Sequence, residues 1–219
     1  MKNKISAVLL CFGKGLRFNN STPKQFINLN NKPIALYSFE TLNLIDEIFE
    51  IIVVVEKEYE HFFKSKKILK FVLGGDRRQD SVFNALKALD QTSEYVLIHD
   101  SARPFADVES INKVVLEAKE HKAATLGCKA IDLIKRVDNI NFNIESLNRN
   151  ELYAIQTPQV IEKNLLIESY NYVYKNNLTI LDDTGAVELL NHKVKIVEGK
   201  RENFKITTPF DLKVAQAII

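Results

Sequence analysis

The chain has 219 residues, 46% of them hydrophobic, which suffices for one sizeable core and predicts a single domain over residues 1–219. Thirty Lys and Arg against 28 Asp and Glu leave a net charge of +2, so no overall field points to a nucleic-acid partner or an anionic membrane surface. Cys11 and Cys128 are far apart and have no neighbouring metal ligands, which suggests a reducing compartment. No stretch approaches the roughly 20 apolar residues of a membrane span, so we expect a cytoplasmic protein.

The first apolar stretch, Ile5 to Phe12, follows two lysines and so imitates a secretory signal sequence. It is short, lacks a small-residue cleavage site and leads directly into a glycine loop, so we interpret it as a buried first strand. Further short apolar runs, bounded by turn residues, are typical of buried strands: Glu50 to Val55, Ile68 to Leu73, Tyr95 to Ile98 and Ala123 to Ala130.

Between these runs the apolar residues recur at helical spacing. One stripe runs from Val82 to Leu89 and another from Val108 to Ala118. The alternation predicts an α/β fold with a mostly parallel sheet and helices on both faces. Ligands bind to such a sheet at the carboxyl ends of its strands, where the loops gather.

Residues 131–148 break this alternation. Ile140, Phe142 and Ile144 alternate with polar residues, and Asp138 with Asn139 separates them from an earlier strand-like stretch, which predicts a β-hairpin arm. A hairpin alone is marginal in water, so its apolar face needs a partner surface. That surface belongs either to the same domain or to a second subunit.

The loop after the first strand, GKGLRFNNSTPKQF, resembles a phosphate-binding loop but fits neither standard glycine-rich motif. A phenylalanine takes the place of the third glycine of the dinucleotide fingerprint, and the Gly-Lys-Ser/Thr of the ATPase loop is absent. The backbone amides of Gly13 and Gly15 can approach phosphate oxygens, and Arg17 and Lys24 supply nearby cations.

Two further loops follow predicted strands. In GGDRRQDSV, Gly75 permits a tight turn, Asp76 can accept hydrogen bonds and either Asp80 or Ser81 can cap the next helix, whereas its two arginines have the character of ordinary surface charges. In HDSARPF, Asp100 directly follows a buried strand. A single carboxylate there suits Mg²⁺, which prefers one or two protein carboxylates plus phosphates and water, although loop bracing is an equal alternative.

Several further polar residues are dispersed along the chain. Arg103, Arg149, Thr157 and Lys205 would each be unremarkable on a surface. Together with the cations of the first loop they would form a cationic site in an otherwise balanced protein, which two phosphorylated substrates and a pyrophosphate leaving group demand.

Taken in order, these motifs resemble one family. GKGLRF with PKQF, then GGDRRQDSV, HDSARPF, RNELYAIQTPQ and FKITTPFDL, are similar to the methylerythritol phosphate cytidylyltransferases of the non-mevalonate isoprenoid pathway, over essentially the whole chain. The resemblance implies a Rossmann-like nucleotidyltransferase fold and a homodimer formed through the β-arm. It also implies an enzyme that joins CTP to 2-C-methyl-D-erythritol 4-phosphate and releases pyrophosphate with Mg²⁺ present.

The resemblance assigns roles to particular residues. The catalytic set would be Arg17 and Lys24 at the α-phosphate, with Arg149 and Lys205 at the attacking phosphate. The polyol phosphate would also contact Arg103 and Thr157, and Asp100 is the metal candidate. Cytosine and ribose would contact the backbone of Leu10, Cys11, Phe12 and Gly13, and also the following residues: Gly75, Asp76, Ser81, Asp100 and Ser101.

The chain departs from the family pattern at two places. Cys11 and Phe12 stand where the family usually has small residues, and Leu133 follows Asp132 where a threonine is usual. A ribitol phosphate cytidylyltransferase shares PKQF, QTPQ and KITTP, but RRQDSV and RNELY favour the isoprenoid enzyme. A non-catalytic nucleotide-binding regulator is the alternative from another class.

Overall fold

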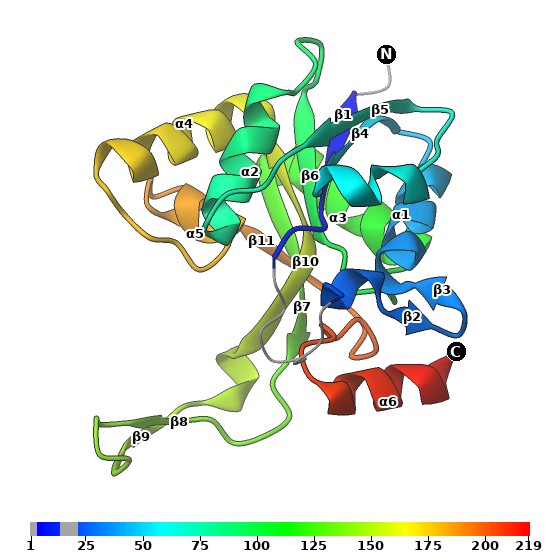
Figure 1. Ribbon diagram of the computed structural model, residues 1–219. Coiled ribbons are helices and arrows are strands. Elements are labelled where there is room, and N and C mark those ends of the chain that lie inside the picture. Colours follow the sequence, from blue (N-terminus) through cyan, green and yellow to red (C-terminus); the bar gives the residue numbers. More distant parts are fainter. Residues whose placement is uncertain (1–3, 14–21) are drawn as a thin grey trace.

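The computed structural model describes residues 4–13 and 22–219, and its centre is a seven-stranded sheet (Figure 1). The strand order is β11-β7-β10-β6-β1-β4-β5. The strands are β1 (Ile5–Leu10), β4 (Ile48–Val54), β5 (Ile68–Val72), β6 (Tyr95–Asp100), β7 (Ala123–Lys129), β10 (Tyr153–Glu162) and β11 (Lys195–Glu198). All five strands predicted from apolar runs are present, within a few residues at their ends.

The sheet is mostly parallel, as predicted. Strand β10 is the exception, because it pairs antiparallel with both β6 and β7. The other four pairs are parallel: β1 with β4, β1 with β6, β4 with β5 and β7 with β11. Near-continuous apolar runs such as that of β4 suit strands that are buried on both faces.

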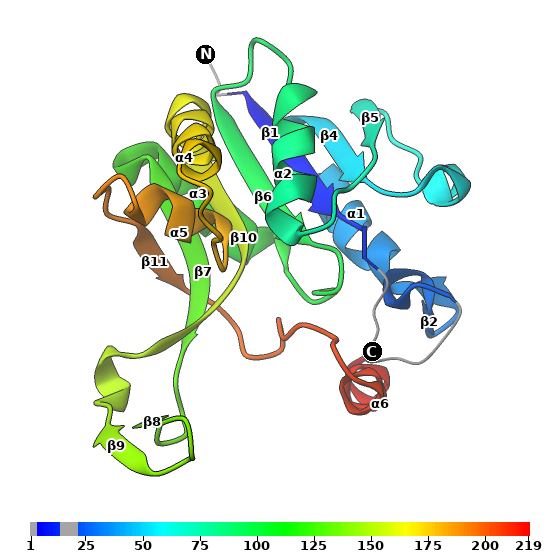
Figure 2. The same cartoon turned by 60° about the vertical axis from the view of Figure 1, so that its left-hand side comes forward.

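Helices cover both faces of the sheet (Figures 1 and 2). On one face α1 (Ile34–Leu44) and α3 (Val108–His121) pack against alternate residues of β1 such as Ala7 and Leu9. On the other face α2 (Arg78–Lys87), α4 (Lys163–Lys175) and α5 (Asp183–Glu188) pack against Val8. Two cores therefore hold the strands in place, and the loops at the strand ends project from a rigid base.

The remaining elements lie outside the seven-stranded sheet. Apart from the arm at residues 131–148, they are β2 (Asn28–Leu29) with β3 (Lys32–Pro33), the 3-10 turns η2 (Lys24–Phe26), η3 (Lys57–Phe62) and η4 (Arg149–Glu151), and the last helix α6 (Pro209–Ile218). The start of α6 is fixed by a capping box in which Thr208 and Asp211 exchange hydrogen bonds. Asp211 Oδ2 also accepts from Thr207 N at 2.8 Å, so the turn just after Lys205 is held firmly.

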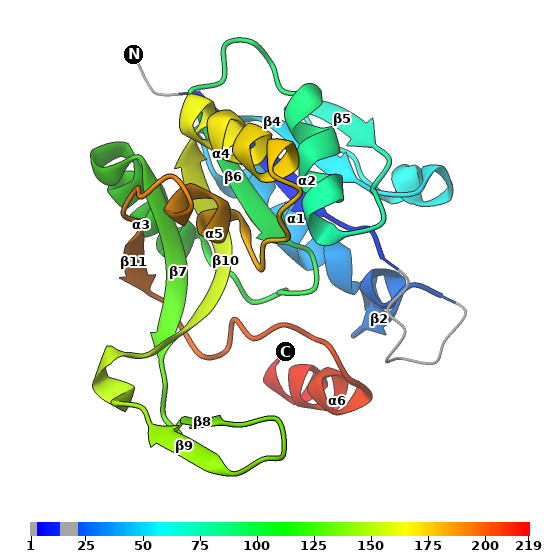
Figure 3. The same ribbon diagram turned by 90° about the vertical axis from the view of Figure 1, so that its left-hand side faces the viewer.

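The predicted hairpin is present as β8 (Lys135–Val137) and β9 (Asn143–Ser146), which pair antiparallel and project beyond the ends of β7 and β10 (Figure 3). Its turn is longer than predicted. Asp138 N donates to Phe142 O at 3.0 Å, so Ile140 and Phe142 belong to the turn and not to the second strand. Within the described ranges, no helix is long and apolar enough to span a bilayer.

Candidate active site

A cavity of about 700 Å³ lies where β1 and β6 end and α2 begins. Strands β1 and β6 pair in parallel so that Leu10 stands beside Asp100. Ser101 then donates from both its N–H and its Oγ to Leu10 O, which ties the two strand ends together. The residues lining this first cavity are Leu10, Phe12, Gly13, Lys24, Gln25, Gly75, Asp76, Arg77, Arg78, Ser81, Asp100, Ser101, Ala102, Lys205 and Thr207.

Asp100 lies at the centre of a charge network in this cavity. It is the last residue of β6, and its two carboxylate oxygens accept from Arg78 Nε at 3.2 Å and from Lys205 Nζ at 2.6 Å. Burial raises the pKa of Asp100, but Arg78 and Lys205 outweigh that effect and hold the pKa well below its ordinary value. Asp100 is therefore an anion at neutral pH.

Arg78 connects Asp100 to a second, fully buried carboxylate. Its Nη2 donates to Asp183 Oδ2 at 2.8 Å, and Tyr170 Oη donates to Asp183 Oδ1 at 2.6 Å. Burial alone would lower the pKa of Arg78, but the two aspartates raise it by more than burial lowers it. The guanidinium therefore stays charged. The expectation that both arginines of the GGDRRQDSV loop are surface charges is wrong for Arg78, because its two anionic partners lie far away in the sequence.

The loop before α2 forms one side of the cavity. Gly75 N donates to Ser81 Oγ at 3.1 Å, and a Cβ on Gly75 would collide with the Asp80 side chain, so glycine is needed there. Asp80 accepts from the backbone and guanidinium of Arg77 and completes the capping box of α2, whereas Ser81, the other predicted cap, lies inside the helix. These contacts hold the turn rigid and leave Asp76 on the cavity wall.

The loop after β1 is described in part. Lys24 lines the cavity and its Nζ donates to Ile206 O at 3.0 Å, next to Lys205. Gly15 and Arg17 lie outside the described residues. Cys11 is 2% exposed and is not among the lining residues, and its carbonyl accepts from Gln25 Nε2 at 2.7 Å while its N–H donates to Val54 O.

A second cavity, of about 630 Å³, shares Arg78, Asp100 and Lys205 with the first. Arg103 and Thr157, both predicted substrate contacts, line this second cavity. The other residues lining it are Thr125, Ile155, Gln156, Gln159, Thr179, Ile180, Leu181, Asp182, Thr184, Gly185, Glu188, Leu189, Val194 and Ile196.

Two polar groups of the second cavity differ in how they are satisfied. Thr157 Oγ1 accepts from Asp100 N at 3.0 Å, so its hydroxyl braces the end of β6. Arg103 donates from Nη1 to Asn203 O at 2.8 Å, whereas its buried Nε has no hydrogen-bond partner among the described residues. Arg103 therefore keeps one side-chain donor that no described residue satisfies.

Arg149 lies apart from both cavities. It opens the turn η4 at the base of the arm, and its Nη1 donates to Ile131 O at 3.2 Å. Within one chain the structure therefore brings together Lys24, Asp100 and Lys205 but leaves Arg149 at the arm.

The first cavity also offers ligands for a divalent cation. Among the described lining residues, Asp76 and Asp100 carry carboxylates. Mg²⁺ is commonly held by one or two carboxylates together with phosphate oxygens and water, so this donor set fits the ion in the presence of a nucleotide. Arg78 and Lys205 already compensate the charge of Asp100, so a nucleotide's phosphates would supply most of the ligands.

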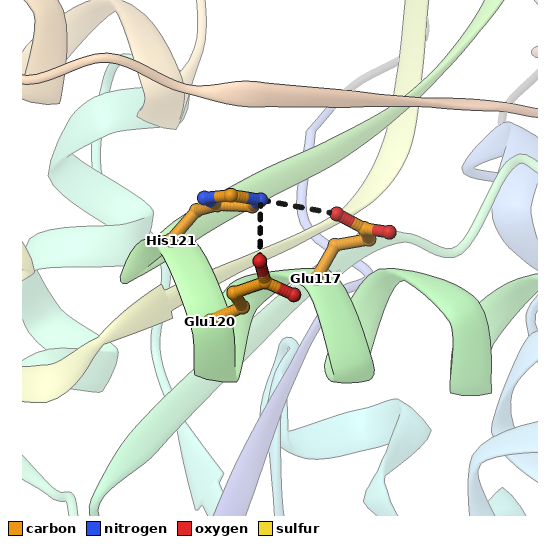
Figure 4. Close-up of side chains that lie close together, drawn as sticks. All are labelled: Glu117, Glu120 and His121. Atoms are coloured by element: carbon orange, nitrogen blue, oxygen red, sulfur yellow. Dashed lines mark ion pairs between the residues drawn. The ribbon is translucent and has the colours of Figure 1, made fainter.

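A different cluster, Glu117, Glu120 and His121 on α3, also brings three possible metal ligands within 4.8 Å of one another (Figure 4). His121 Nε2 lies 3.3 Å from Glu117 Oε2 and 3.8 Å from Glu120 Oε1. Lys195 Nζ also lies 3.8 Å from Glu117 Oε2, so a cation is already present. The group forms an ordinary charged helix face.

Sequence reasoning missed Arg78, Gln25 and the buried anchor Asp183. The position of Arg78 at the first turn of a helix that follows a glycine turn was the available signal, because such a side chain can reach the neighbouring strand end. Nothing in the sequence around Asp183 indicated its partner.

Comparisons with known proteins cover the whole chain. The family described as "IspD: 2-C-methyl-D-erythritol 4-phosphate cytidylyltransferase" matches residues 5–219. The protein of that name from Clostridium beijerinckii is 43% identical over 222 residues, which cover 98% of each chain. The chloroplastic protein of Oryza sativa subsp. japonica is 40% identical, over 100% of this chain and 75% of that protein.

A solved structure agrees. The crystal structure of 4-diphosphocytidyl-2C-methyl-D-erythritol synthase from Anaerococcus prevotii has a TM-score of 0.89 at 32% identity, and the match covers 100% of this chain and 99% of that one. The chain has a mostly parallel sheet with a cation-lined cavity at its strand ends, and its relatives are cytidylyltransferases. These findings define it as a nucleotidyltransferase. The chain belongs to the 2-C-methyl-D-erythritol 4-phosphate cytidylyltransferase family, which confirms the resemblance found in its motifs.

Proposed function

We propose that the chain transfers a cytidylyl group from CTP to 2-C-methyl-D-erythritol 4-phosphate and releases pyrophosphate, as a step of isoprenoid precursor biosynthesis. The observation that carries the proposal is the convergence of Lys24, Arg78 and Lys205 on one cavity, in a chain that matches this family from residue 5 to residue 219. A cation-lined cavity of about 700 Å³ has the size and charge that a nucleoside triphosphate requires.

The reaction needs positioning more than proton transfer. An oxygen of the polyol phosphate attacks the α-phosphorus of CTP, the bond from that phosphorus to the bridging oxygen breaks, and pyrophosphate leaves. The attacking phosphate is already an anion, so no general base is required. His99, whose pKa burial lowers to about 4, is neutral and occupied in hydrogen bonds, in keeping with this view.

Two sets of cations would bind the two substrates, one at the α-phosphate of CTP and the other at the polyol phosphate. Lys24, together with Arg17, would stabilise charge on the α-phosphate as pyrophosphate departs. Lys205 and Arg103 would hold the polyol phosphate, since both line the second cavity and Lys205 also lines the first. The nucleotide and the polyol phosphate would thus meet where the two cavities share Asp100.

We propose that Mg²⁺ accompanies CTP, with Asp100 as its protein ligand. When bound, the ion would neutralise part of the triphosphate charge. The chain's own contribution is an ionised carboxylate that Arg78 and Lys205 keep in a fixed orientation.

We also propose a homodimer formed through the arm. Phe142 is 69% exposed and Leu133 is 61% exposed, so the arm presents apolar side chains to solvent. Covering these side chains with a second copy of the chain would remove their apolar surface from water. It would also bring Arg149 of one subunit toward the cavities of the other. The two free cysteines, finally, favour a reducing compartment such as the cytoplasm.

The test supplies CTP and Mg²⁺ with either 2-C-methyl-D-erythritol 4-phosphate or ribitol 5-phosphate and measures pyrophosphate release. Release with the first substrate supports the proposal. Release with ribitol 5-phosphate alone would assign the chain to the related polyol activity. Tight CTP binding without release from either substrate would make it a nucleotide-binding regulator.

A further inference from the structure

Phe12 is the large apolar residue at the entrance of the glycine loop, and it lines the first cavity between Leu10 and Gly13. It is partly buried and packs against the core under α2 and α4. Part of the residue is therefore held in the core, and part of it lines the cavity.

The ring packs directly against a glycine of the neighbouring loop. A Cβ added to Gly74 would lie 2.8 Å from Phe12 Cβ and closer still to ring atoms Cγ and Cδ1. Real Cβ atoms do not approach other carbons so closely, so the aromatic side chain occupies the space that any side chain at position 74 would need. The loop after β1 and the loop before α2 thus interlock through this pair.

Polar groups that can recognise a base edge lie next to this ring in the same cavity. Gly75 follows Gly74 directly, and Asp76 and Ser81 also line the cavity. The Asp76 carboxylate can accept from an exocyclic amino group, and Ser81 Oγ can both donate and accept. An aromatic side chain beside such groups offers the flat apolar surface on which bases stack in many nucleotide sites.

The cations Lys24 and Lys205 line the same cavity. Lys24 and Lys205 reach it from other loops, and the Lys24 ammonium group is held near residue 206. The cavity therefore offers both cations and the group formed by Phe12, Gly75 and Ser81, as a molecule that carries a triphosphate and a base requires.

We propose that Phe12 is a nucleotide-binding residue of this chain that acts through its side chain, by forming the apolar wall against which the pyrimidine ring of the nucleotide packs. The inference rests on the proposed function, since it takes CTP as the nucleotide. It adds a side-chain role for Phe12 to the backbone contact expected from sequence, and it makes Gly74 a positioning residue that keeps the ring in the cavity.

The test compares two ligands by titration calorimetry at a fixed Mg²⁺ concentration: CTP, which carries a base, and inorganic tripolyphosphate, which does not. Phe12→Ala is expected to weaken CTP binding about 5- to 150-fold, the range that corresponds to loss of one base–aromatic stacking contact. Tripolyphosphate affinity should stay at the value of the unmodified protein. Phe12→Leu, which keeps an apolar side chain of similar size, should lie between the two for CTP, and it reports on the site even where the alanine variant fails to fold.

Gly74→Ala provides the second arm of the experiment. Its methyl group displaces the ring, so CTP binding should weaken while tripolyphosphate binding stays unchanged. The double variant Phe12→Ala/Gly74→Ala should bind CTP no worse than Phe12→Ala alone, because the displaced ring is already absent.

Unchanged CTP affinity in Phe12→Ala would overturn the inference, as would an equal loss of CTP and tripolyphosphate, which indicates a collapsed loop. Failure of the proposed function gives a different result, because the unmodified protein would then bind CTP no better than tripolyphosphate or release no pyrophosphate.

Discussion

The ammonium group of Lys205 lies 2.6 Å from Asp100 Oδ2, although the two residues are 105 positions apart in the sequence. Asp100 comes from the end of β6, and Lys205 comes from the segment that leads into α6, where the capping box of Thr208 and Asp211 fixes the turn. A phosphate that enters the second cavity therefore competes with Asp100 for Lys205. Substrate binding would release one carboxylate oxygen of Asp100 for another cation.

The first prediction follows from that exchange. Asp100→Asn should raise the Mg²⁺ concentration needed for half-maximal pyrophosphate release severalfold, because a neutral amide is a poorer ligand for a hard cation. The exposed helix residue Glu109, changed to Gln, is the matched control and should leave the magnesium titration where it was. An unaltered titration for Asp100→Asn would mean that this carboxylate only braces the loop.

A second prediction concerns the buried anchor of Arg78. Asp183→Asn keeps the shape of the side chain but leaves the Arg78 guanidinium with one anionic partner instead of two. Removing one member of a buried ion pair costs about 3 to 5 kcal/mol, so the variant should lose that much unfolding free energy. Urea denaturation measures the loss. Tyr170→Phe removes a single hydrogen bond to Asp183 and should cost only about 1 to 2 kcal/mol. Equal losses for the two variants would show that the ion pair between Arg78 and Asp183 contributes no more to stability than one hydrogen bond.

The third prediction separates catalysis from binding at Lys24. Lys24→Ala should lower kcat by about 100-fold or more, since a cation placed where charge develops acts mainly in the transition state. The KM for CTP should change far less. Lys64→Ala, at an exposed lysine on another face, serves as the control. Near-normal turnover of Lys24→Ala would remove Lys24 from the mechanism.

The fourth prediction tests whether two subunits share one site. Arg149→Ala and Lys24→Ala chains, unfolded together and refolded, should recover activity, because a mixed dimer has one intact site and one doubly damaged site. Random pairing makes half of the dimers mixed, so about a quarter of all sites should recover. If mixed dimers are confirmed by mass but their activity is no higher than the average of the two variants alone, Arg149 does not contribute to the partner's site.

The last prediction uses the two thiols. Burial raises the pKa of Cys11 to about 12, so at pH 8 its thiol is neutral and unreactive, and it is also 2% exposed. A disulfide reagent should therefore modify only the less buried Cys128 in the native protein and both cysteines in urea. Cys128→Ser should abolish the native reaction. Rapid modification of Cys11 in that variant would mean that the segment after β1 opens readily.

The sequence by itself determined the class of fold and most of the site loops. Buried parallel strands must be apolar on both faces, so runs such as Tyr95 to Ile98 are recognisable without any knowledge of their neighbours. The loops after such strands also marked Lys24 as a phosphate-binding cation and Asp100 as a metal candidate from local residues, whereas Lys205 was assigned through the family resemblance. All three line the first cavity.

The tertiary structure alone decided the place of β10 and the partners of Arg78. Strand β10 carries Gln156, Thr157 and Gln159, which are polar yet at most 4% exposed, so no apolar run marks it. These side chains can be buried because Asn203, His99 and the backbone of Asp183 satisfy their hydrogen bonds from distant parts of the chain. Arg78 was read as a surface charge for the same physical reason: a buried polar group is stable only beside partners, and those partners become neighbours only when the chain folds.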